Sequence, residues 1–409
     1  MIGKNLEIPF GEFEGTSAVK LSQEAQNCDK MQIIRPETCV YEKKIVPLHS
    51  QRLTCEMLKT VLTNTTQFIA SVPKVERKRY GQFFTSEASA LYMASLFHFD
   101  IEKPMLRILD AGAGTGLLSA AMVSRLVKLG YNGHIHIICY ETDEKVLPIL
   151  RTNMEYLRTQ ADLTYTIKPE NYLLSQLFEN NQNPLAAHFD YIVGNPPYLK
   201  IGKNAPEAKA MSAICYGAPN LYFLFWAMGI FNLKQDGELV YIIPRSWTSG
   251  AYFEYFRKYL LSHCVIENLH LFVSRNKVFD SESVLQETMI IKVKKTQRKP
   301  NNVIVTSSTS THFSDLQTFI VPYSTVVDKN QYVYLVTNQQ DADVLRRVNR
   351  LPQTLPSVDL KMKTGIVVDY RTQEVLRNEY EEGASPLFYA SHIKDGKVTW
   401  PIGKTGEYI

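Results

Sequence analysis

The residues best suited to chemistry are Asn195, Pro196, Pro197 and Tyr198, which directly follow the apolar run FDYIVG. The two prolines fix two φ angles and remove two N–H donors, so the turn is stiff and offers acceptors: the Asn195 side-chain oxygen and the Pro196 carbonyl. Rigid acceptors suit a planar amino group, because they hold its nitrogen closer to tetrahedral and stabilise the positive charge that develops on attack. Tyr198 adds a flat face for stacking a base. A purely structural proline turn is the alternative interpretation.

A glycine-rich segment, Asp110-Ala111-Gly112-Ala113-Gly114-Thr115-Gly116, follows another apolar run and precedes the helix-like LLSAAMVSRLVKLG. Alternate glycines let the backbone turn tightly and approach a ligand closely, and a helix start supplies free N–H donors. The G-x-G-x-G spacing differs from the G-x-G-x-x-G of dinucleotide enzymes and from a Walker loop. A carboxylate at Asp110 would attract the ammonium group of a methionine moiety and repel a pyrophosphate. A plain strand-to-helix turn is the competing explanation.

A second acidic residue, Glu141, ends the next strand-like run, HIHIICYE. Ligands of doubly wound sheets bind at the carboxyl ends of the strands, where a carboxylate can accept both hydroxyls of a ribose. Alone, Glu141 is weak evidence, because many strands end in an acidic residue. Together with the glycine-rich turn it predicts a nucleoside site.

Between about 80 and 295 the pattern alternates between strand-like and helix-like runs, which is typical of a mostly parallel sheet with helices on both faces. The expected strands are 106–112, 134–141, 163–168, 189–195, 237–244 and 283–293, and the expected helices are 85–98, 117–129, 143–158, 219–233 and 251–262. No helix follows 283–293, so we expect this strand to be antiparallel. Residues 51–72 predict an amphipathic helix, whereas 302–409 loses the alternation.

A further segment, Tyr80-Gly81-Gln82-Phe83-Phe84-Thr85, precedes the glycine-rich turn. With it, residues 77–295 resemble the adenine-N6 DNA methyltransferases of restriction–modification systems, of the TaqI and PstI/BsuBI kind. The gamma class of these enzymes has the same order of motifs: this segment first, then the glycine-rich turn, then Asn195–Tyr198, and then a C-terminal region. The resemblance implies a Rossmann-like, doubly wound, mostly parallel seven-stranded sheet.

The resemblance also implies domains and partners. We expect an N-terminal helical extension at 1–76, a catalytic domain dependent on S-adenosylmethionine at 77–300, and an irregular, partly β target-recognition region, or part of one, at 301–409. The implied substrate is double-stranded DNA, from which the target adenine is flipped at a cost of a few kcal/mol. A cognate restriction endonuclease acting separately is a further expected partner.

The family motifs carry over to individual residues. Tyr80 and Thr85, with Asp110, Gly112, Gly114 and Gly116, would hold the methionine part of the cofactor, and Glu141 its ribose. Asn171 stands where the family usually has an aspartate that contacts the adenine amino group, so it keeps an acceptor but loses the charge.

Aromatic residues complete the implied site. Tyr172 would flank the adenine of the cofactor, and Phe225 would line the same pocket. Phe279, in Lys277-Val278-Phe279, would pack against the flipped base opposite Tyr198. A core phenylalanine is an alternative role for Phe279. His and Cys spacing suggests no metal site.

Composition limits the class of protein. Hydrophobic residues make up 45% and charged residues 21% of 409, and no apolar run is long enough to predict a membrane span. Six scattered cysteines without a C-x-x-C pair argue against disulfides or zinc and favour the cytoplasm. A net charge of +4 permits nucleic-acid binding without requiring it.

Two other functions stay open at this point. Enzymes that methylate RNA or a protein glutamine amide also carry an Asn-Pro-Pro-aromatic turn, because a planar amide poses the same chemical problem as a base amine. The Tyr80–Thr85 segment and the long region after 295 favour DNA adenine. A non-catalytic DNA-recognition protein that retains a cofactor pocket is the alternative of another class, and the intact Asn195–Tyr198 turn argues against it.

Overall fold

The computed structural model describes residues 48–71, 85–179, 183–273, 288–361, 367 and 372–409, with the backbone alone for 48–55. The predicted residues Tyr80 and Phe279 lie outside the described residues. No described helix combines the length and the apolar character that crossing a membrane requires.

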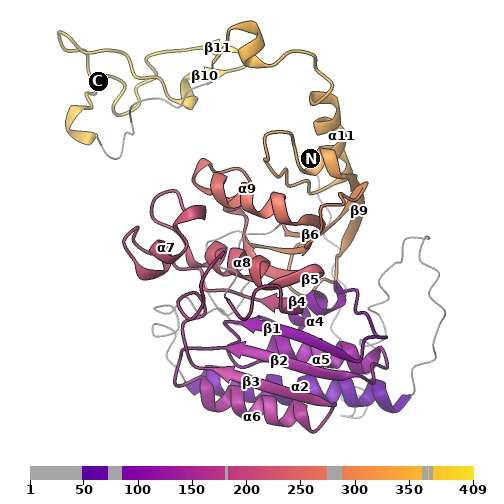
Figure 1. Ribbon diagram of the computed structural model, residues 1–409. Helices are drawn as coiled ribbons and strands as arrows, with labels where there is room; N and C mark the ends of the chain where they lie inside the picture. Colours follow the sequence, from indigo (N-terminus) through magenta and orange to yellow (C-terminus); the bar gives the residue numbers. More distant parts are fainter. Residues whose placement is uncertain (1–47, 72–84, 180–182, 274–287, 362–366, 368–371) are drawn as a thin grey trace, which may run out of the picture.

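Within the described residues, nine strands form one sheet in the order β3-β2-β1-β4-β5-β7-β6-β8-β9 (Figure 1). The strands are β1 (Met105–Ala111), β2 (His134–Tyr140), β3 (Leu163–Lys168), β4 (Phe189–Gly194), β5 (Leu233–Pro244), β6 (Val265–Phe272), β7 (Thr288–Lys294), β8 (Asn302–Ser308) and β9 (Gln317–Pro322). The run from β3 through β5 is parallel, and β7 is antiparallel to both β5 and β6. The predicted doubly wound, mostly parallel sheet is therefore confirmed, as is the antiparallel β7.

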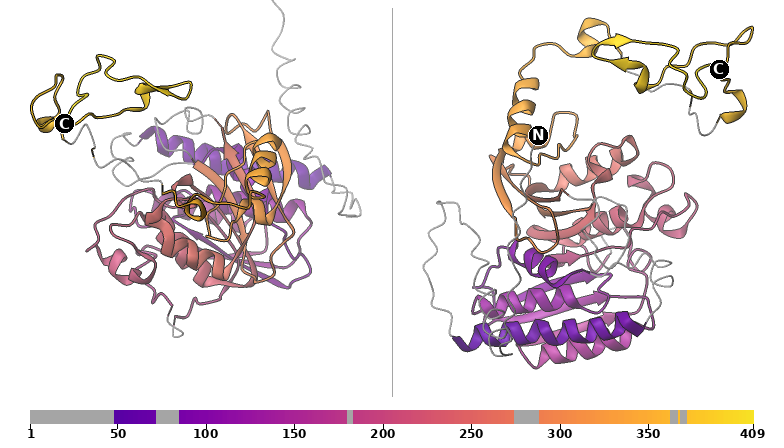
Figure 2. Two further views of the ribbon diagram at one scale, coloured as in Figure 1. Left: turned by 90° about the horizontal axis from the view of Figure 1, so that it is seen from above. Right: turned by 180° about the vertical axis from the view of Figure 1, so that it is seen from behind.

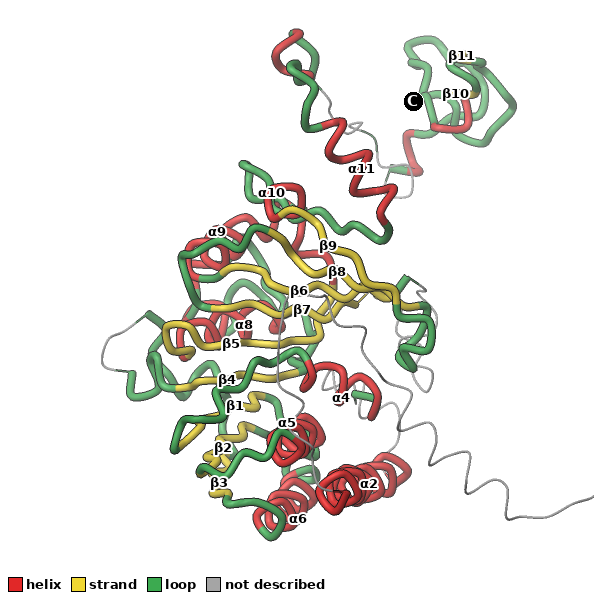
Figure 3. Tube along the Cα trace, turned by 90° about the vertical axis from the view of Figure 1, so that its right-hand side faces the viewer, coloured by secondary structure: helices red, strands yellow, loops and turns green. Residues whose placement is uncertain are grey.

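Helices cover both faces of this sheet, as the side view in Figure 3 shows. The helices are α2 (Leu48–Ser71), α4 (Glu87–Ser95), α5 (Leu117–Lys128), α6 (Leu147–Arg158), α7 (Pro206–Ala210), α8 (Leu221–Asn232), α9 (Glu254–His263), α10 (Tyr323–Val326) and α11 (Gln339–Val348). One core cluster joins the sheet to α8 and α9, and the other joins it to α2, α4, α5 and α6. On the second face α2 packs against α5 and α6, outside the layer that contacts the strands.

Burial explains why the central elements form. Strand β4 is buried along its whole length, which fits a strand with helices on both sides. Helix α8 is apolar around almost its whole circumference, because the sheet lies on one side and α9 on the other. Asn220 caps the start of α8, because its side chain accepts from the Tyr222 N–H. Trp226 of α8 packs edge-on against Trp247 with ring centroids 4.9 Å apart.

Two features of the sheet were not predicted. Strand β6 was missed, because Glu267, Asn268 and His270 interrupt its apolar run. The sheet also continues past residue 300: β8 pairs with β6 in parallel and β9 closes the edge. The seven strands β1–β7 thus form the expected sheet, and β8 and β9 extend it.

The C-terminal part beyond α11 stands away from the sheet, on the side of α9 (Figures 1 and 2). Its only described regular pairing is between the two-residue strands β10 (Ile393–Lys394) and β11 (Lys397–Val398). The irregular character expected for this region is what the structure shows.

Candidate active site

The carboxyl ends of β1, β2 and β4 meet at one edge of the sheet, because these strands are parallel neighbours in register. Ala111 lies opposite Tyr140, and Asp110 lies opposite both Cys139 and Val193. The connections diverge between β1 and β4, which is the switch point where doubly wound sheets bind ligands. A cavity of about 610 Å³ opens there.

The glycine-rich turn forms one wall of this cavity. Gly112, Gly114 and Gly116 have φ values of +74°, +55° and +84°. These values lie in the left-handed region of backbone conformation, which residues with a side chain rarely adopt. A Cβ on Gly112 would lie 3.8 Å from Phe225 Cε1 and 4.0 Å from Pro197 Cδ, and a Cβ on Gly114 would meet nothing within 4 Å. The turn therefore comes close to both α8 and the proline turn, and leaves open space at Gly114.

The Glu141 carboxylate is fixed by the backbone at the end of β2. Its Oε2 accepts from the Gly114 N–H at 2.9 Å, and its Oε1 accepts from the N–H groups of Thr142 and Asp143 at 2.8 and 2.9 Å. Burial raises the pKa of Glu141, against the effect of these three donors. Glu141 lines the cavity and holds the glycine-rich turn at the same time.

Asp110 lies behind the turn and not in the cavity wall. Its side chain is fully buried, and its Oδ2 accepts from Ser119 Oγ of α5 at 2.7 Å. Oδ1 has no hydrogen-bond partner among the described residues. Burial raises the pKa of this carboxyl to about 7. The structure therefore does not bring Asp110 to the surface that a ligand would touch.

The proline turn lies beside the glycine-rich turn, since a Cβ on Gly112 would be 4.0 Å from Pro197 Cδ. The Asn195 amide nitrogen donates to Thr85 Oγ1 at 3.2 Å, so the segment before α4 orients the side chain at the end of β4. Asn195, Pro197 and Thr85 all line the cavity. The arrangement joins the predicted Thr85 to the predicted acceptor turn, although they are far apart in the sequence.

Tyr198 is anchored more deeply than the sequence suggested. Its hydroxyl donates to the Ile242 carbonyl at 2.9 Å, and only 8% of the residue is exposed. Its ring packs edge-on against Tyr222 at 6.3 Å between centroids. Tyr198 and Pro196 are not among the residues that line the cavity.

An aromatic row forms another part of the cavity wall. Tyr172 lies between Tyr140 and Phe225, with ring centroids 4.9 and 5.2 Å away. The Tyr172 hydroxyl accepts from Asn232 Nδ2 at 2.9 Å, which fixes the ring from behind. All three aromatic residues line the cavity and suit a flat heterocycle.

Asn171 is engaged differently from the expectation. Its Oδ1 accepts from the N–H groups of Leu173 and Leu174 at 3.0 and 3.2 Å, and its Nδ2 donates to Glu207 Oε1 at 2.8 Å. Two backbone donors and one carboxylate acceptor fix the orientation of the amide. Asn171 lines the cavity, and its oxygen accepts from two N–H groups of its own turn.

Of the predicted residues in the described part, nine line the cavity: Thr85, Gly112, Gly114, Glu141, Asn171, Tyr172, Asn195, Pro197 and Phe225. Asp110, Gly116, Pro196 and Tyr198 are buried and are not among the lining residues. The sequence missed Tyr140, Leu199 and Leu221. Leu221 donates its N–H to the Leu199 carbonyl at 2.8 Å, so the start of α8 pairs with the residues after the proline turn. The position of Tyr140, directly before Glu141, is the signal that was available.

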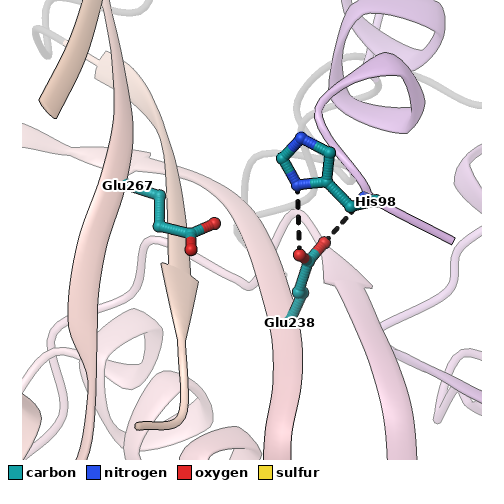
Figure 4. A group of neighbouring side chains, drawn as sticks. All are labelled: His98, Glu238 and Glu267. Atoms are coloured by element: carbon teal, nitrogen blue, oxygen red, sulfur yellow. Dashed lines mark hydrogen bonds and ion pairs between the residues drawn. The ribbon is translucent and has the colours of Figure 1, made fainter. Parts of the chain in front are cut away.

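A cluster of His98, Glu238 and Glu267 also went unpredicted (Figure 4). Its ligand-type atoms lie within 4.8 Å of one another. The fully buried Lys292 ammonium lies 2.9 Å from Glu238 Oε1 and 3.0 Å from Glu267 Oε2 and contacts His98 Nδ1. A lysine thus already supplies the positive charge at this cluster, which lies toward the start of β5 and away from the cavity.

Known proteins resemble most of the chain. Residues 120–279 match the Eco57I restriction-modification methylase family. The type II methyltransferase M.PstI of Providencia stuartii is 33% identical over 340 residues, and M.BsuBI of Bacillus subtilis is 30% identical over 334. Each alignment covers 80% of this chain and 66% of the relative, just under two thirds of its length.

Among solved structures, the methyltransferase subunit of a type I restriction-modification system from Streptococcus thermophilus is 20% identical, with a TM-score of 0.44 over 66% of this chain and 53% of that one. The sequence relatives, the matched family and the motif order agree. Residues 120–279 thus match the Eco57I restriction-modification methylase family, and most of the chain is similar to the type II restriction–modification methyltransferases M.PstI and M.BsuBI.

Proposed function

We propose that the protein transfers a methyl group from S-adenosylmethionine to the exocyclic amine of an adenine in double-stranded DNA. The observation that supports this most directly is the position of Asn195. Its side chain, oriented by Thr85 at 3.2 Å, lines the same cavity as the glycine-rich turn. An acceptor for a planar amine and a nucleoside site therefore share one cavity.

The residues of the cavity fit S-adenosylmethionine. The open space at Gly114 and the positive φ of the turn admit a close backbone approach. Glu141 offers its remaining lone pairs to ribose hydroxyls, and the row of Tyr140, Tyr172 and Phe225 offers flat apolar contact to an adenine. When bound, this cofactor supplies an electrophilic methyl group on a sulfonium centre.

The chain's own contribution to the reaction is orientation. Asn195 Oδ1 and the Pro196 carbonyl accept the two N–H groups of the substrate amine and hold its nitrogen toward the cofactor site. These fixed acceptors stabilise the charge that develops on nitrogen without any reorganisation during the reaction. Tyr198 contributes by packing near the flipped base, and Phe279 is proposed to pack on its other side.

Duplex DNA is favoured over RNA or a protein amide by the extent of the similarity. The expected catalytic domain spans 77–300, whereas the alignment with M.PstI covers 340 residues and must extend well outside it. Because β8 and β9 belong to the sheet, we narrow the expected recognition region at 301–409 to the segment beyond α11. A restriction endonuclease that cleaves the same site and acts separately is the proposed functional partner, with both proteins in the cytoplasm.

The test compares Asn195→Ala with Asn132→Ala, an exposed loop residue before β2. Removing the acceptor should lower the rate of methyl transfer to duplex DNA about 100-fold or more, while S-adenosylhomocysteine binding stays close to wild type. Asn132→Ala should match wild type in both assays. Mass spectrometry of digested DNA should identify N6-methyladenine.

Two results would overturn the proposal. One is wild-type methylation by Asn195→Ala, which would remove the role of the proline turn. The other is transfer of labelled methyl groups by the wild-type protein to RNA or to protein glutamine, and not to duplex DNA, in a direct comparison.

A further inference from the structure

The buried face of helix α2 contains a threonine where the helix pattern calls for an apolar residue. Met57, Leu58 and Val61 of α2 are buried in the core that they share with α5 and α6, and Phe68 is also buried. Thr65 lies on the same face and is only 2% exposed. A buried hydroxyl needs a partner, and the partner of this one belongs to the glycine-rich turn.

Thr65 and Thr115 form a hydrogen bond whose direction is fixed. Thr65 Oγ1 donates to the Val61 carbonyl at 2.7 Å and also lies 2.7 Å from Thr115 Oγ1. A hydroxyl has one proton, and a carbonyl can only accept. The Thr115 hydroxyl is therefore the donor, and Thr65 is its acceptor.

A second link reaches the backbone of the same residue. Asn64 Nδ2 donates to Asn153 Oδ1 at 2.7 Å, and Asn153 Nδ2 donates to the Thr115 carbonyl at 2.8 Å. Asn153 belongs to α6 and is fully buried. Helix α2 thus holds the side chain of Thr115 directly and its carbonyl through α6.

The position of Thr115 makes these anchors consequential. It lies between Gly114 and Gly116, both in the left-handed region, and it lines the cavity. Glycines on both sides give the turn many accessible conformations, so contacts from outside the turn must select the one that binds a ligand. Preselecting that conformation raises affinity, because binding no longer has to order the turn.

We propose that α2 is a functional part of the methyl-donor site, in which Thr65 and the Asn64–Asn153 pair are positioning residues that preorganise the glycine-rich turn through Thr115. This inference rests on the proposed function for the identity of the ligand. It assigns a role in cofactor binding to a helix that precedes the whole catalytic sheet in the sequence and whose described side chains do not line the cavity.

The test uses three substitutions in α2 of the full chain. Thr65→Val keeps the shape and the β-branching but removes the acceptor, and Thr65→Ser restores a hydroxyl. Thr66→Val is the matched control, because Thr66 makes the same kind of bond to the carbonyl four residues earlier but faces solvent. Amide hydrogen exchange across 112–117 is measured without ligand, and S-adenosylhomocysteine and S-adenosylmethionine affinities are measured by calorimetry.

Thr65→Val should speed exchange in the turn and raise both dissociation constants about fivefold, the effect of one lost hydrogen bond. For Thr65→Ser and Thr66→Val, the exchange rates and dissociation constants should stay near those of wild type. The KM for DNA and the thermal midpoint should differ little among the three variants. Equal behaviour of Thr65→Val and Thr66→Val would overturn the proposal, as would equal losses in Thr65→Val and Thr65→Ser.

The two arms separate this inference from the proposed function. If wild-type protein binds no S-adenosylmethionine, the proposed cofactor is wrong. The exchange comparison, made without ligand, still decides whether Thr65 controls the conformation of the glycine-rich turn.

Discussion

Asp110 gives the stability of the protein a pH dependence that can be assigned to one residue. Burial raises its pKa from 3.8 to about 7, so the folded protein holds a proton that the unfolded chain releases in that interval. The contribution of Asp110 to stability is therefore complete below pH 3.8, the pKa of this carboxyl in the unfolded chain. It is lost as the pH rises to about 7, the pKa in the folded protein. Asp110→Asn stays neutral and still offers an oxygen to Ser119.

Wild type should lose this stability as the pH rises, whereas Asp110→Asn should not. The free energy of unfolding of Asp110→Asn minus that of wild type should therefore increase by about 2 kcal/mol between about pH 5 and about pH 8. Urea denaturation at several pH values measures this difference, in which the other titrating groups largely cancel. Parallel stability curves for the two proteins would show that the Asp110 carboxyl titrates normally.

Residue types and spacing predicted the position of most cavity residues but not the orientation of their side chains. Glu141 and Asn195 follow buried strands, so parallel pairing alone places them together. The sequence could not show that the Asn171 oxygen caps its own turn, because that depends on Glu207, which lies 36 residues away and approaches only in the folded chain. Asp110 illustrates the same limit, since strand alternation points it to the face covered by α5.

Strands β5, β6 and β7 are held together by a buried charge cluster as well as by their hydrogen bonds. Lys292 of β7 lies between Glu238 of β5 and Glu267 of β6 and is fully buried. Lys292→Met should lower the free energy of unfolding by about 3–5 kcal/mol, because it leaves the buried Glu238 carboxylate and the partly buried Glu267 carboxylate without the lysine counter-charge. Adding Glu238→Gln to it should recover part of that loss.

Lys299→Met, on the exposed loop after β7, is the matched control and should change stability little. S-adenosylhomocysteine affinity should be retained in all three proteins, because the cluster lies away from the cavity. Urea denaturation of Lys292→Met that matches the control would show that the two carboxylates are protonated or solvated without Lys292.

The elements with continuous apolar runs were predicted, and β6, whose apolar run is interrupted by polar residues, was not. The run FDYIVG and the helix after Gly116 were found because their burial is continuous. Strand β6 was missed because His270 and Glu267 look solvent-exposed in sequence, whereas His270 is fully buried beside Thr306 Oγ1 at 2.9 Å. Strand β8 supplies that partner, so β6 and the edge beyond residue 300 depend on each other.

In the whole molecule, the sheet and the segment beyond α11 differ in how they are stabilised. The hydrophobic core extends as far as Ala342 of α11. Beyond it, large apolar side chains are widely exposed, with Leu355 at 49%, Phe388 at 55% and Tyr380 at 68%. Figure 2 shows this segment apart from the body in a second orientation. The cofactor cavity and the proposed recognition region therefore share few stabilising contacts.

A chain that ends after Leu351 should separate the two activities. It keeps the core, α2 and every cavity residue, so S-adenosylhomocysteine affinity should match that of the full chain. The target site is first read by sequencing methylated adenine in DNA from cells that express the full chain. Fluorescence anisotropy with target and random duplexes should then show that the shortened chain loses its preference for the target and retains weak, salt-dependent binding. Unchanged preference for the target would place recognition within the catalytic part, on the surface around α7 and α9.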